Sequence, residues 1–217
     1  MPKLSSRLPR LYAIVDVGCL SASRKTTSAI VEFACELAAG GVELIQYRNK
    51  DGDARTMLSH GRELRRALDR KVKLVMNDRA DLCIAAGFDG VHVGQDDLSP
   101  QGARLVVGPQ RIVGVSTHNL EQLKQADASP VDYIAYGPIF STTAKRNPDP
   151  VVGLEGLRAA RAATKKPLVA IGGITRANAV SVLEAGADCV AVISDLVTSS
   201  RKAAEEFLLS IRSRLSD

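Results

Sequence analysis

The chain has no tryptophan among its 217 residues, and aromatic residues make up only 4% of it. Aromatic side chains are the platforms on which proteins stack unpaired bases, so their scarcity argues against a nucleic-acid partner. The net charge of +5 comes from 29 basic and 24 acidic residues. A modest positive charge attracts small anions such as phosphorylated substrates, and we expect small-molecule partners of that kind.

Long apolar runs are also missing from the sequence. No run reaches the roughly 18 residues that a membrane-spanning helix needs. The basic N-terminus, MPKLSSRLPR, lacks the apolar core of a secretory signal. We therefore expect no membrane partner and a cytoplasmic location, while the sequence leaves open whether the chain forms a homo-oligomer.

The cysteines form no C-x-x-C pair and match no zinc-binding spacing. Three of the four lie in apolar contexts such as CIAAG and CVAVI. Because cysteine is among the most frequently buried residues, the sequence predicts free, buried thiols at Cys19, Cys35, Cys83 and Cys189.

Eight short segments of nearly continuous apolar character recur along the chain, and most are rich in β-branched residues. Continuous rather than alternating apolar character is typical of parallel strands that are covered by helices. The predicted strands are residues 11–16, 42–48, 72–78, 90–94, 112–117, 132–138, 167–173 and 189–194.

Helical patterns fill the gaps between these segments, and strands that alternate with helices form a parallel sheet. The first strand runs into Asp16-Val17-Gly18, not into the glycine-rich turn of an open dinucleotide-binding sheet. The sequence therefore predicts one (β/α)₈ barrel domain over residues 1–217, with residues 1–9 as a flexible extension. The predicted helices are residues 28–41, 56–70, 79–87, 99–108, 119–126, 154–164, 176–187 and 201–215, of which 99–108 is the least regular.

Polar residues gather where the predicted strands end. In a barrel these ends converge on one rim, and active sites lie on that rim. Any single polar residue there is compatible with an ordinary helix cap, but caps do not explain Arg and Lys beside several acidic residues. The residues in question are Gln46, Arg48, Lys50, Asn77, Asp78, Gln95, Asp96, Asp97, Ser116, Thr117, His118 and the segment 141–147.

The charges at this rim suggest a division of labour. Arg48, Lys50 and Lys145 can surround an anion, because Arg offers a planar fork and Lys a point charge. Asp78 and Asp97 follow adjacent strands, so their carboxylates can approach each other. Two carboxylates with substrate phosphate oxygens suit Mg²⁺, whereas without a metal the pair could act as acid and base. The basic neighbours favour metal plus phosphate.

A second anion site is predicted at the ends of the last two strands. Loops in this position often hold a phosphate in barrel enzymes. The segment IGGIT (171–175) supplies two glycines that let backbone N–H groups approach an anion, and VIS (192–194) supplies the neighbouring loop.

Seven motifs in this sequence together resemble those of thiamine phosphate synthases, and the likeness covers most of the chain. The combination of Q-x-R-x-K, N-D and G-Q-x-D is specific, whereas the G-G-I turn is shared with many barrels. In order, the motifs are QYRNK (46–50), LVMNDRADL (74–82), DGVHVGQDDL (89–98), GVSTHN (114–119), YGPIFSTTAK (136–145), PLVAIGGIT (167–175) and GADCVAVIS (186–194).

The resemblance implies a Mg²⁺-dependent transferase of thiamine biosynthesis. Such enzymes join 4-amino-2-methyl-5-hydroxymethylpyrimidine diphosphate to a thiazole phosphate, also in its carboxylated form, and release thiamine phosphate and pyrophosphate. In the family, ionisation of the C–O bond gives a stabilised pyrimidine cation, which the thiazole nitrogen captures. A dissociative step of this kind needs charge stabilisation on the leaving group more than it needs a base.

The resemblance also implies residue roles, carried over position by position. Arg48, Lys50, Ser116 and Lys145 form the implied catalytic set. The full set places Gln46, Arg48, Lys50 and Asn77 on the pyrimidine diphosphate, Asp78 and Asp97 on Mg²⁺, Ser116 and Lys145 on the pyrophosphate, and Thr142, Gly173, Ile193 and Ser194 on the thiazole phosphate.

Two positions depart from the family pattern, and two other functions stay open. Ala144 replaces a threonine of the common T-x-T-K motif, which affects the expected thiazole site, and Asn49 stands where an acidic residue is common. A related thiazole tautomerase, with His118 as its base, is the first alternative. The second is a non-catalytic barrel that binds a thiamine precursor. The presence of Asp78, Asp97 and Lys145 favours the synthase over the tautomerase, and an intact charged site argues against the non-catalytic barrel.

Overall fold

The computed structural model describes residues 8–142 and 149–215. Its eight strands are all parallel and close into a barrel in which each strand pairs with the next along the chain and β8 pairs with β1. Each strand lies within its predicted segment. The strands are β1 (Leu11–Asp16), β2 (Leu44–Arg48), β3 (Lys73–Asn77), β4 (Gly90–Val93), β5 (Ile112–Thr117), β6 (Tyr133–Tyr136), β7 (Leu168–Ala170) and β8 (Cys189–Val192).

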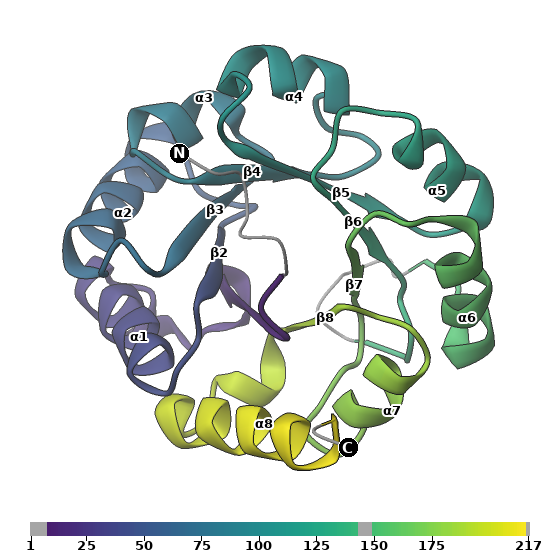
Figure 1. The fold of residues 1–217 in the computed structure, drawn as a ribbon. Helices are drawn as coiled ribbons and strands as arrows, with labels where there is room; N and C mark the ends of the chain where they lie inside the picture. The colour runs from purple at the N-terminus through teal and green to yellow at the C-terminus, as the bar shows by residue number, and fades with distance from the viewer. Residues whose placement is uncertain (1–7, 143–148, 216–217) are drawn as a thin grey trace.

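Eight helices form a ring around the strands, as Figure 1 shows down the barrel axis. The segment 99–108 is a helix because Ser99 caps its N-terminus and Pro100 occupies the first turn, where no backbone N–H is needed. The helices are α1 (Thr27–Ala39), α2 (Ala54–Ala67), α3 (Ala80–Ala85), α4 (Pro100–Val107), α5 (Leu120–Asp127), α6 (Gly153–Ala163), α7 (Ala179–Glu184) and α8 (Ser200–Leu215), with short 3-10 turns η1 (Val17–Cys19), η2 (Ala22–Arg24) and η3 (Ser194–Leu196).

The strands place successive side chains on opposite sides of the barrel wall. The larger apolar cluster lies between the strands and the helices and includes Ile45 and Leu74, whereas a smaller one fills the barrel interior and includes Leu44 and Val75. Leu8, just before β1, belongs to the interior cluster and is only 4% exposed. The interior is therefore a packed core, and the larger cavity lies above it, at the C-terminal ends of the strands.

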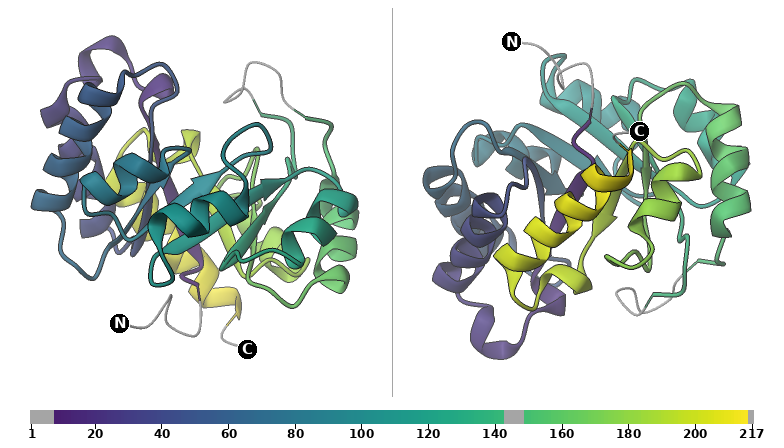
Figure 2. Two further views of the ribbon diagram at one scale, coloured as in Figure 1. Left: turned by 90° about the horizontal axis from the view of Figure 1, so that it is seen from above. Right: turned by 60° about the horizontal axis from the view of Figure 1, so that its bottom comes forward.

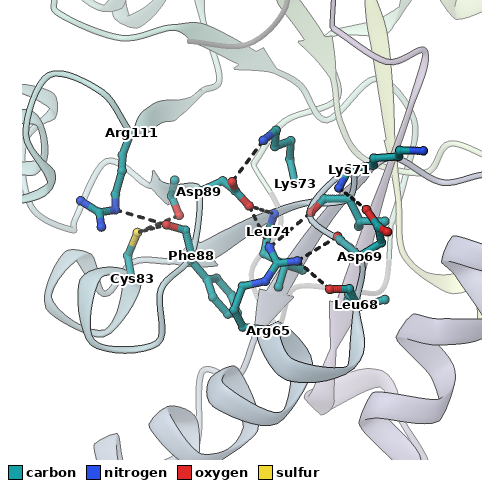
Figure 3. A network of polar contacts seen from close by, with 12 residues as sticks. Arg65, Leu68, Asp69, Lys71, Lys73, Leu74, Cys83, Phe88, Asp89 and Arg111 are labelled. Atoms are coloured by element: carbon teal, nitrogen blue, oxygen red, sulfur yellow. Dashed lines mark hydrogen bonds and ion pairs between the residues drawn. The ribbon is translucent and has the colours of Figure 1, made fainter. Parts of the chain in front are cut away.

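The N-terminal ends of the strands, here called the bottom rim, are held by ion pairs that also bind backbone groups (Figure 3). Asp89 accepts a hydrogen bond from the N–H of Leu74 at the start of β3 (2.9 Å) and forms ion pairs with Arg65 (3.1 Å) and Lys73 (3.3 Å). Arg65 also donates to two carbonyl oxygens just after α2, both at 2.8 Å. Its Nε is buried without a hydrogen-bond partner. One carboxylate thus ties helix α2 to strand β3.

The same arrangement recurs twice further around the barrel. In each case an arginine near the end of an even-numbered helix pairs with an aspartate just before an even-numbered strand, and that aspartate accepts the N–H of a residue in the preceding strand. The bottom-rim pairs are Arg65–Asp89, Arg104–Asp132 (2.5 Å, with the N–H of Val113 at 2.8 Å) and Arg161–Asp188 (2.8 Å, with the N–H of Leu168 at 2.9 Å).

Two views from other directions show the helices lying outside the strands (Figure 2). In the part of the chain that the structure describes, no helix is long and apolar enough to cross a membrane. The four cysteines are free, as expected, but only Cys83 and Cys189 are fully buried. Cys19 and Cys35 are partly exposed, so the prediction of burial is wrong for these two.

Candidate active site at the top rim

A cavity of about 880 Å³ opens at the C-terminal ends of the strands, here called the top rim. It is the place where the sequence predicts an active site, and every described residue with a predicted role lines it. Thr117, which the sequence also places at this rim, is buried and donates to the carbonyl oxygen of Ala135 (2.9 Å). Lys145, together with Thr143 and Ala144, lies outside the described residues. The predicted residues that line the cavity are Gln46, Arg48, Lys50, Asn77, Asp78, Asp97, Ser116, Thr142, Gly173, Ile193 and Ser194.

Strand β2 sends alternate side chains into the cavity. Gln46, Arg48 and Lys50 line it, whereas Tyr47 and Asn49 point to the other side of the strand, where the amide of Asn49 donates to the hydroxyl of Tyr47 (3.2 Å). This alternation is the two-residue period of a strand carried past its end. The departure from the family pattern at Asn49 therefore lies outside the cavity lining.

Arg48 is oriented by a carboxylate that the sequence analysis did not assign to the site. Its Nη1 lies 2.5 Å from Oδ2 of Asp16, which is the last residue of β1 and pairs with Arg48 in the sheet register. The side chain of Asp16 is only 1% exposed, and its Oδ1 also accepts the N–H of Gly18 (2.9 Å). The ion pair with Asp16 therefore fixes the orientation of the guanidinium at the cavity. The position of Asp16 at a strand end was the signal that could have found it.

Asp78 and Asp97 meet at the top rim, as their adjacent strands require. Nζ of Lys50 lies 2.5 Å from Oδ2 of Asp78 and 3.9 Å from Oδ1 of Asp97. Burial, a hydrogen bond with Asp97 and its negative charge raise the pKa of Asp78 to about 6, although Lys50 opposes the shift. Burial also acts to raise the pKa of Asp97, but hydrogen bonds from Asp78 and the N–H of Gly94 and the charge of Lys50 lower it overall. The pair therefore prefers to share a proton or bind a cation.

The backbone at this pair is unusual as well. Asp78 has φ of +62°, in the left-handed region that few residues other than glycine, asparagine and aspartate adopt. Its N–H donates to the carbonyl oxygen of His92 across the barrel wall (2.7 Å). This turn leads β3 into α3 and brings the carboxylate to the cavity. Among the described residues, no group of three or more His, Cys, Asp or Glu side chains could hold a metal.

Ser116, at the end of β5, faces the same cavity. Its Oγ lies 2.8 Å from Nε2 of His92, and its carbonyl oxygen accepts the side-chain amide of Gln95 (2.6 Å). His92 occupies an inward position of β4 and lines the cavity, but the sequence analysis gave it no role. The alternation along GVHVG was the available signal, because it places the imidazole on the same side as the two flanking glycines.

The opposite side of the cavity consists mainly of backbone and small side chains. Gly172 and Gly173 have φ of +88° and +66°, and a Cβ at either position would lie 2.4–2.6 Å from atoms of the loop after β6, at Pro138 and Ser141. These glycines therefore allow the loops after β6 and β7 to touch. The N–H groups of Gly173 and Ser194 donate no hydrogen bond to another described residue, which leaves them available to an anion.

His118 also lines the cavity but is held by the backbone. Its Nδ1 lies 2.6 Å from the carbonyl oxygen of Gly137, so this nitrogen carries a proton and donates it. Its Nε2 lies 3.4 Å from Oδ2 of Asp149. Both partners of the imidazole belong to the connection between β6 and α6, which orients the ring.

Comparisons with known proteins show the family to which this chain is related. Residues 11–196 match the family described as thiamine monophosphate synthase. The chain is 64% identical over 207 residues to a thiamine-phosphate synthase of Koribacter versatilis, covering 95% of this chain and 98% of that one. A second such protein, from Chloroflexus aurantiacus, is 44% identical over 88% of this chain and 86% of its own length.

A solved structure extends this likeness to three dimensions. The structure of a thiamine phosphate pyrophosphorylase from Pyrococcus furiosus superimposes with a TM-score of 0.82 at 34% identity. The superposition covers 95% of this chain and 96% of the other. A 3-hexulose-6-phosphate synthase, at 21% identity and a TM-score of 0.69, shares the fold alone.

Proposed function

Because the chain belongs to the thiamine monophosphate synthase family, we propose that it condenses 4-amino-2-methyl-5-hydroxymethylpyrimidine diphosphate with 4-methyl-5-(2-phosphoethyl)thiazole. The products are thiamine phosphate and pyrophosphate. In this proposal the thiazole phosphate can also be used in its carboxylated form. Both substrates are small, charged molecules, which supports the cytoplasm as the place where the enzyme works.

One observation carries the proposal: a single cavity has charged side chains on one side and glycine and small side chains on the other. On one side Arg48 and Lys50 stand beside two carboxylates. On the other, Gly173 and Ser194 offer backbone N–H groups. A diphosphate with its metal suits the first side, and a monophosphate suits the second. The reacting carbon and nitrogen would meet between them.

The carboxylate pair fits Mg²⁺ as the cofactor. The ammonium group of Lys50 already lies against both carboxylates, so this position attracts a cation. Mg²⁺ binds through one or two carboxylates, substrate phosphates and several waters, and Asp78 with Asp97 supplies the protein part of such a set. When bound there, the ion would neutralise charge on the diphosphate and so make it a better leaving group.

The leaving diphosphate is the group that this chain's own residues must stabilise. Arg48, held by Asp16, can bind two phosphate oxygens with its planar fork. Lys50 is 47% exposed at its side chain and can move from the carboxylates to the phosphates. The amide of Asn77 and the hydroxyl of Ser116 add hydrogen bonds in the same part of the cavity. Lys145 would add a further positive charge in this proposal.

The reaction then needs little acid–base chemistry. As the C–O bond breaks, the electron pair leaves with the pyrophosphate and a pyrimidine cation remains. The thiazole nitrogen donates its lone pair to that carbon and forms the new C–N bond. Thr142, Gly173, Ile193 and Ser194 would hold the thiazole phosphate so that its nitrogen faces the cation, which is catalysis by positioning and by charge.

A pyrophosphate-release assay tests the proposal. Purified protein mixed with both substrates and Mg²⁺ should release pyrophosphate and form thiamine phosphate, and removal of Mg²⁺ with a chelator should stop both. Isomerisation of the thiazole without pyrophosphate release would instead identify a tautomerase. Binding of either substrate without any conversion would identify a non-catalytic barrel.

A further inference from the structure

A chain of buried hydrogen bonds crosses the barrel interior below the cavity. The amide Nε2 of Gln46 lies 2.8 Å from the hydroxyl of Tyr12, which lies 3.0 Å from the hydroxyl of Tyr133. That hydroxyl lies 2.8 Å from Nδ1 of His92, whose Nε2 lies 2.8 Å from Oγ of Ser116. The two ends, Gln46 and Ser116, both line the cavity.

The barrel reserves space for this chain. Tyr12 and Tyr133 are 1% and 0% exposed, and their rings meet edge-on with centroids 6.0 Å apart. A Cβ at Gly114 would lie 2.0 Å from the ring of Tyr133, so only glycine leaves room for that ring. An apolar residue at these positions would fill a barrel interior as well. The two buried hydroxyls therefore need an explanation beyond packing.

The donors and acceptors give the chain one direction. A side-chain amide nitrogen can only donate, so the hydroxyl of Tyr12 accepts a hydrogen bond from Gln46 and donates one to the hydroxyl of Tyr133. The hydroxyl of Tyr133 then donates a hydrogen bond to Nδ1 of His92. Because Nδ1 accepts, Nε2 is the nitrogen that carries the proton and donates to Ser116. In the reverse direction the proton of Tyr12, which is 1% exposed, would find no acceptor among the described residues, which is costly.

Burial supports this picture of two protonated phenols. It raises the pKa values of both Tyr12 and Tyr133 well above the ordinary value of 10.0. Each phenol therefore stays protonated and donates one hydrogen bond to the next residue of the chain. Since Oγ of Ser116 accepts from His92, its own proton is free to point into the cavity. At the other end, Oε1 of Gln46 has no hydrogen-bond partner among the described residues and is free to accept.

We propose that Tyr133 and His92 are positioning residues that fix Ser116 as a hydrogen-bond donor and Gln46 as an acceptor toward the bound pyrimidine diphosphate. This inference rests on the proposed function. An acceptor at Gln46 suits the amino group of the pyrimidine, and a donor at Ser116 suits a diphosphate oxygen that gains charge as the bond breaks. In this arrangement His92 does not act as a base that activates Ser116.

Substitution of Tyr133 by phenylalanine tests the proposal, because it removes one link and keeps the ring. We expect Tyr133→Phe to lower kcat about tenfold, with a smaller change in KM for the pyrimidine diphosphate. The matched control is Tyr47→Phe. Tyr47 is also a buried tyrosine 2.8 Å from a histidine, His60, but it lies outside the barrel interior. The Tyr47→Phe enzyme should keep its kcat within about twofold of wild type.

A double substitution separates positioning from general damage. If Tyr133 acts through Ser116, then Tyr133→Phe should have little further effect on kcat in a Ser116→Ala background. A full, multiplied loss in the double variant would overturn the positioning of Ser116 by Tyr133. So would a Tyr133→Phe enzyme with the kcat of wild type, or with the same loss as Tyr47→Phe.

Nitrogen-15 NMR of the imidazoles tests the direction without any turnover. The chain has only three histidines, so His92→Gln assigns the His92 signals by difference. We expect the proton on Nε2, and none on Nδ1, in the free enzyme. A proton on Nδ1 would overturn the direction of the chain. If the wild-type protein released no pyrophosphate, the proposed function would fail, and this measurement would still decide the direction.

Discussion

At the bottom rim each aspartate of the three pairs has an arginine of its own, whereas at the top rim Asp78 and Asp97 share Lys50. The bottom-rim aspartates also accept backbone N–H groups, and their arginines bind carbonyl oxygens just after helices. At the top, burial raises the pKa of Asp78 to about 6. The same residue types thus complete the fold at one end and leave charge to be satisfied by a ligand at the other.

The largest expected effect is at the top rim. Asp97→Ala should lower kcat/KM on the order of 10³-fold, because it removes half of the proposed Mg²⁺ site beside the leaving group. Its Tm should stay close to that of wild type. Pyrophosphate release and thermal unfolding measure the two properties. Asp81→Ala, which removes an exposed carboxylate nearby, is the control, and wild-type activity of Asp97→Ala would refute the metal role.

The reverse result is expected at the bottom rim. Asp132→Asn leaves Arg104 without its ionic partner, and both side chains are at least 84% buried. Breaking such a pair costs about 3 kcal/mol of the free energy of unfolding, which lowers the Tm by about 6–12 °C in a chain of this size. Denaturant and thermal unfolding measure this loss. The kcat of the folded variant should not change, and a large fall in kcat would show that the two rims are not separate.

Asp16 resembles the bottom-rim aspartates because it has an arginine of its own and accepts a backbone N–H, but it lies at the top rim and orients Arg48 at the cavity. Asp16→Asn should raise the KM for the pyrimidine diphosphate about tenfold, because Arg48 loses the charge that holds it. Steady-state kinetics with each substrate varied in turn will show this. The KM for the thiazole phosphate is the internal control, and an equal rise in both would contradict the assignment of Arg48 to the diphosphate.

The smallest effect concerns stability without Mg²⁺. The folded-state pKa of Asp78 lies above its ordinary value of 3.8, so the folded protein binds more protons between about pH 4 and pH 6. Stability therefore falls as pH rises through this window and stays lower above it. Asp78→Asn should remove this loss and raise the Tm at pH 8 by about 2–4 °C, with no gain at pH 4. A lower Tm at pH 8 would show that the pair with Lys50 outweighs the burial.

The sequence predicted the barrel and most of the top rim because both follow from local patterns. Apolar segments marked the strands, and polar residues at their ends marked the cavity. Gln46, Arg48 and Lys50 were predicted together because they lie where one apolar segment ends, and the alternation along β2 explains why all three line the cavity. The family resemblance then supplied the substrates, which no pattern in the residues could have given.

Residues whose role depends on contacts between distant strands could not be predicted from the sequence. Tyr12 and Tyr133 are 121 positions apart in the chain and meet only when the barrel closes. In the sequence His92 is one residue of a short apolar segment, and only the fold brings its Nε2 within 2.8 Å of Oγ of Ser116. The bottom-rim pairs were missed for the same reason, since each joins a helix to an aspartate 24–28 positions later.

Gly114 has a consequence for how such barrels can diverge. The ring of Tyr133 occupies the space that a side chain at position 114 would need. A larger residue at 114 therefore requires a smaller one at 133. The loss of the tyrosine by itself leaves the fold room but breaks the link between Gln46 and Ser116. Across related sequences these two positions should covary, and a lineage that changes both should also have changed how it recognises the pyrimidine.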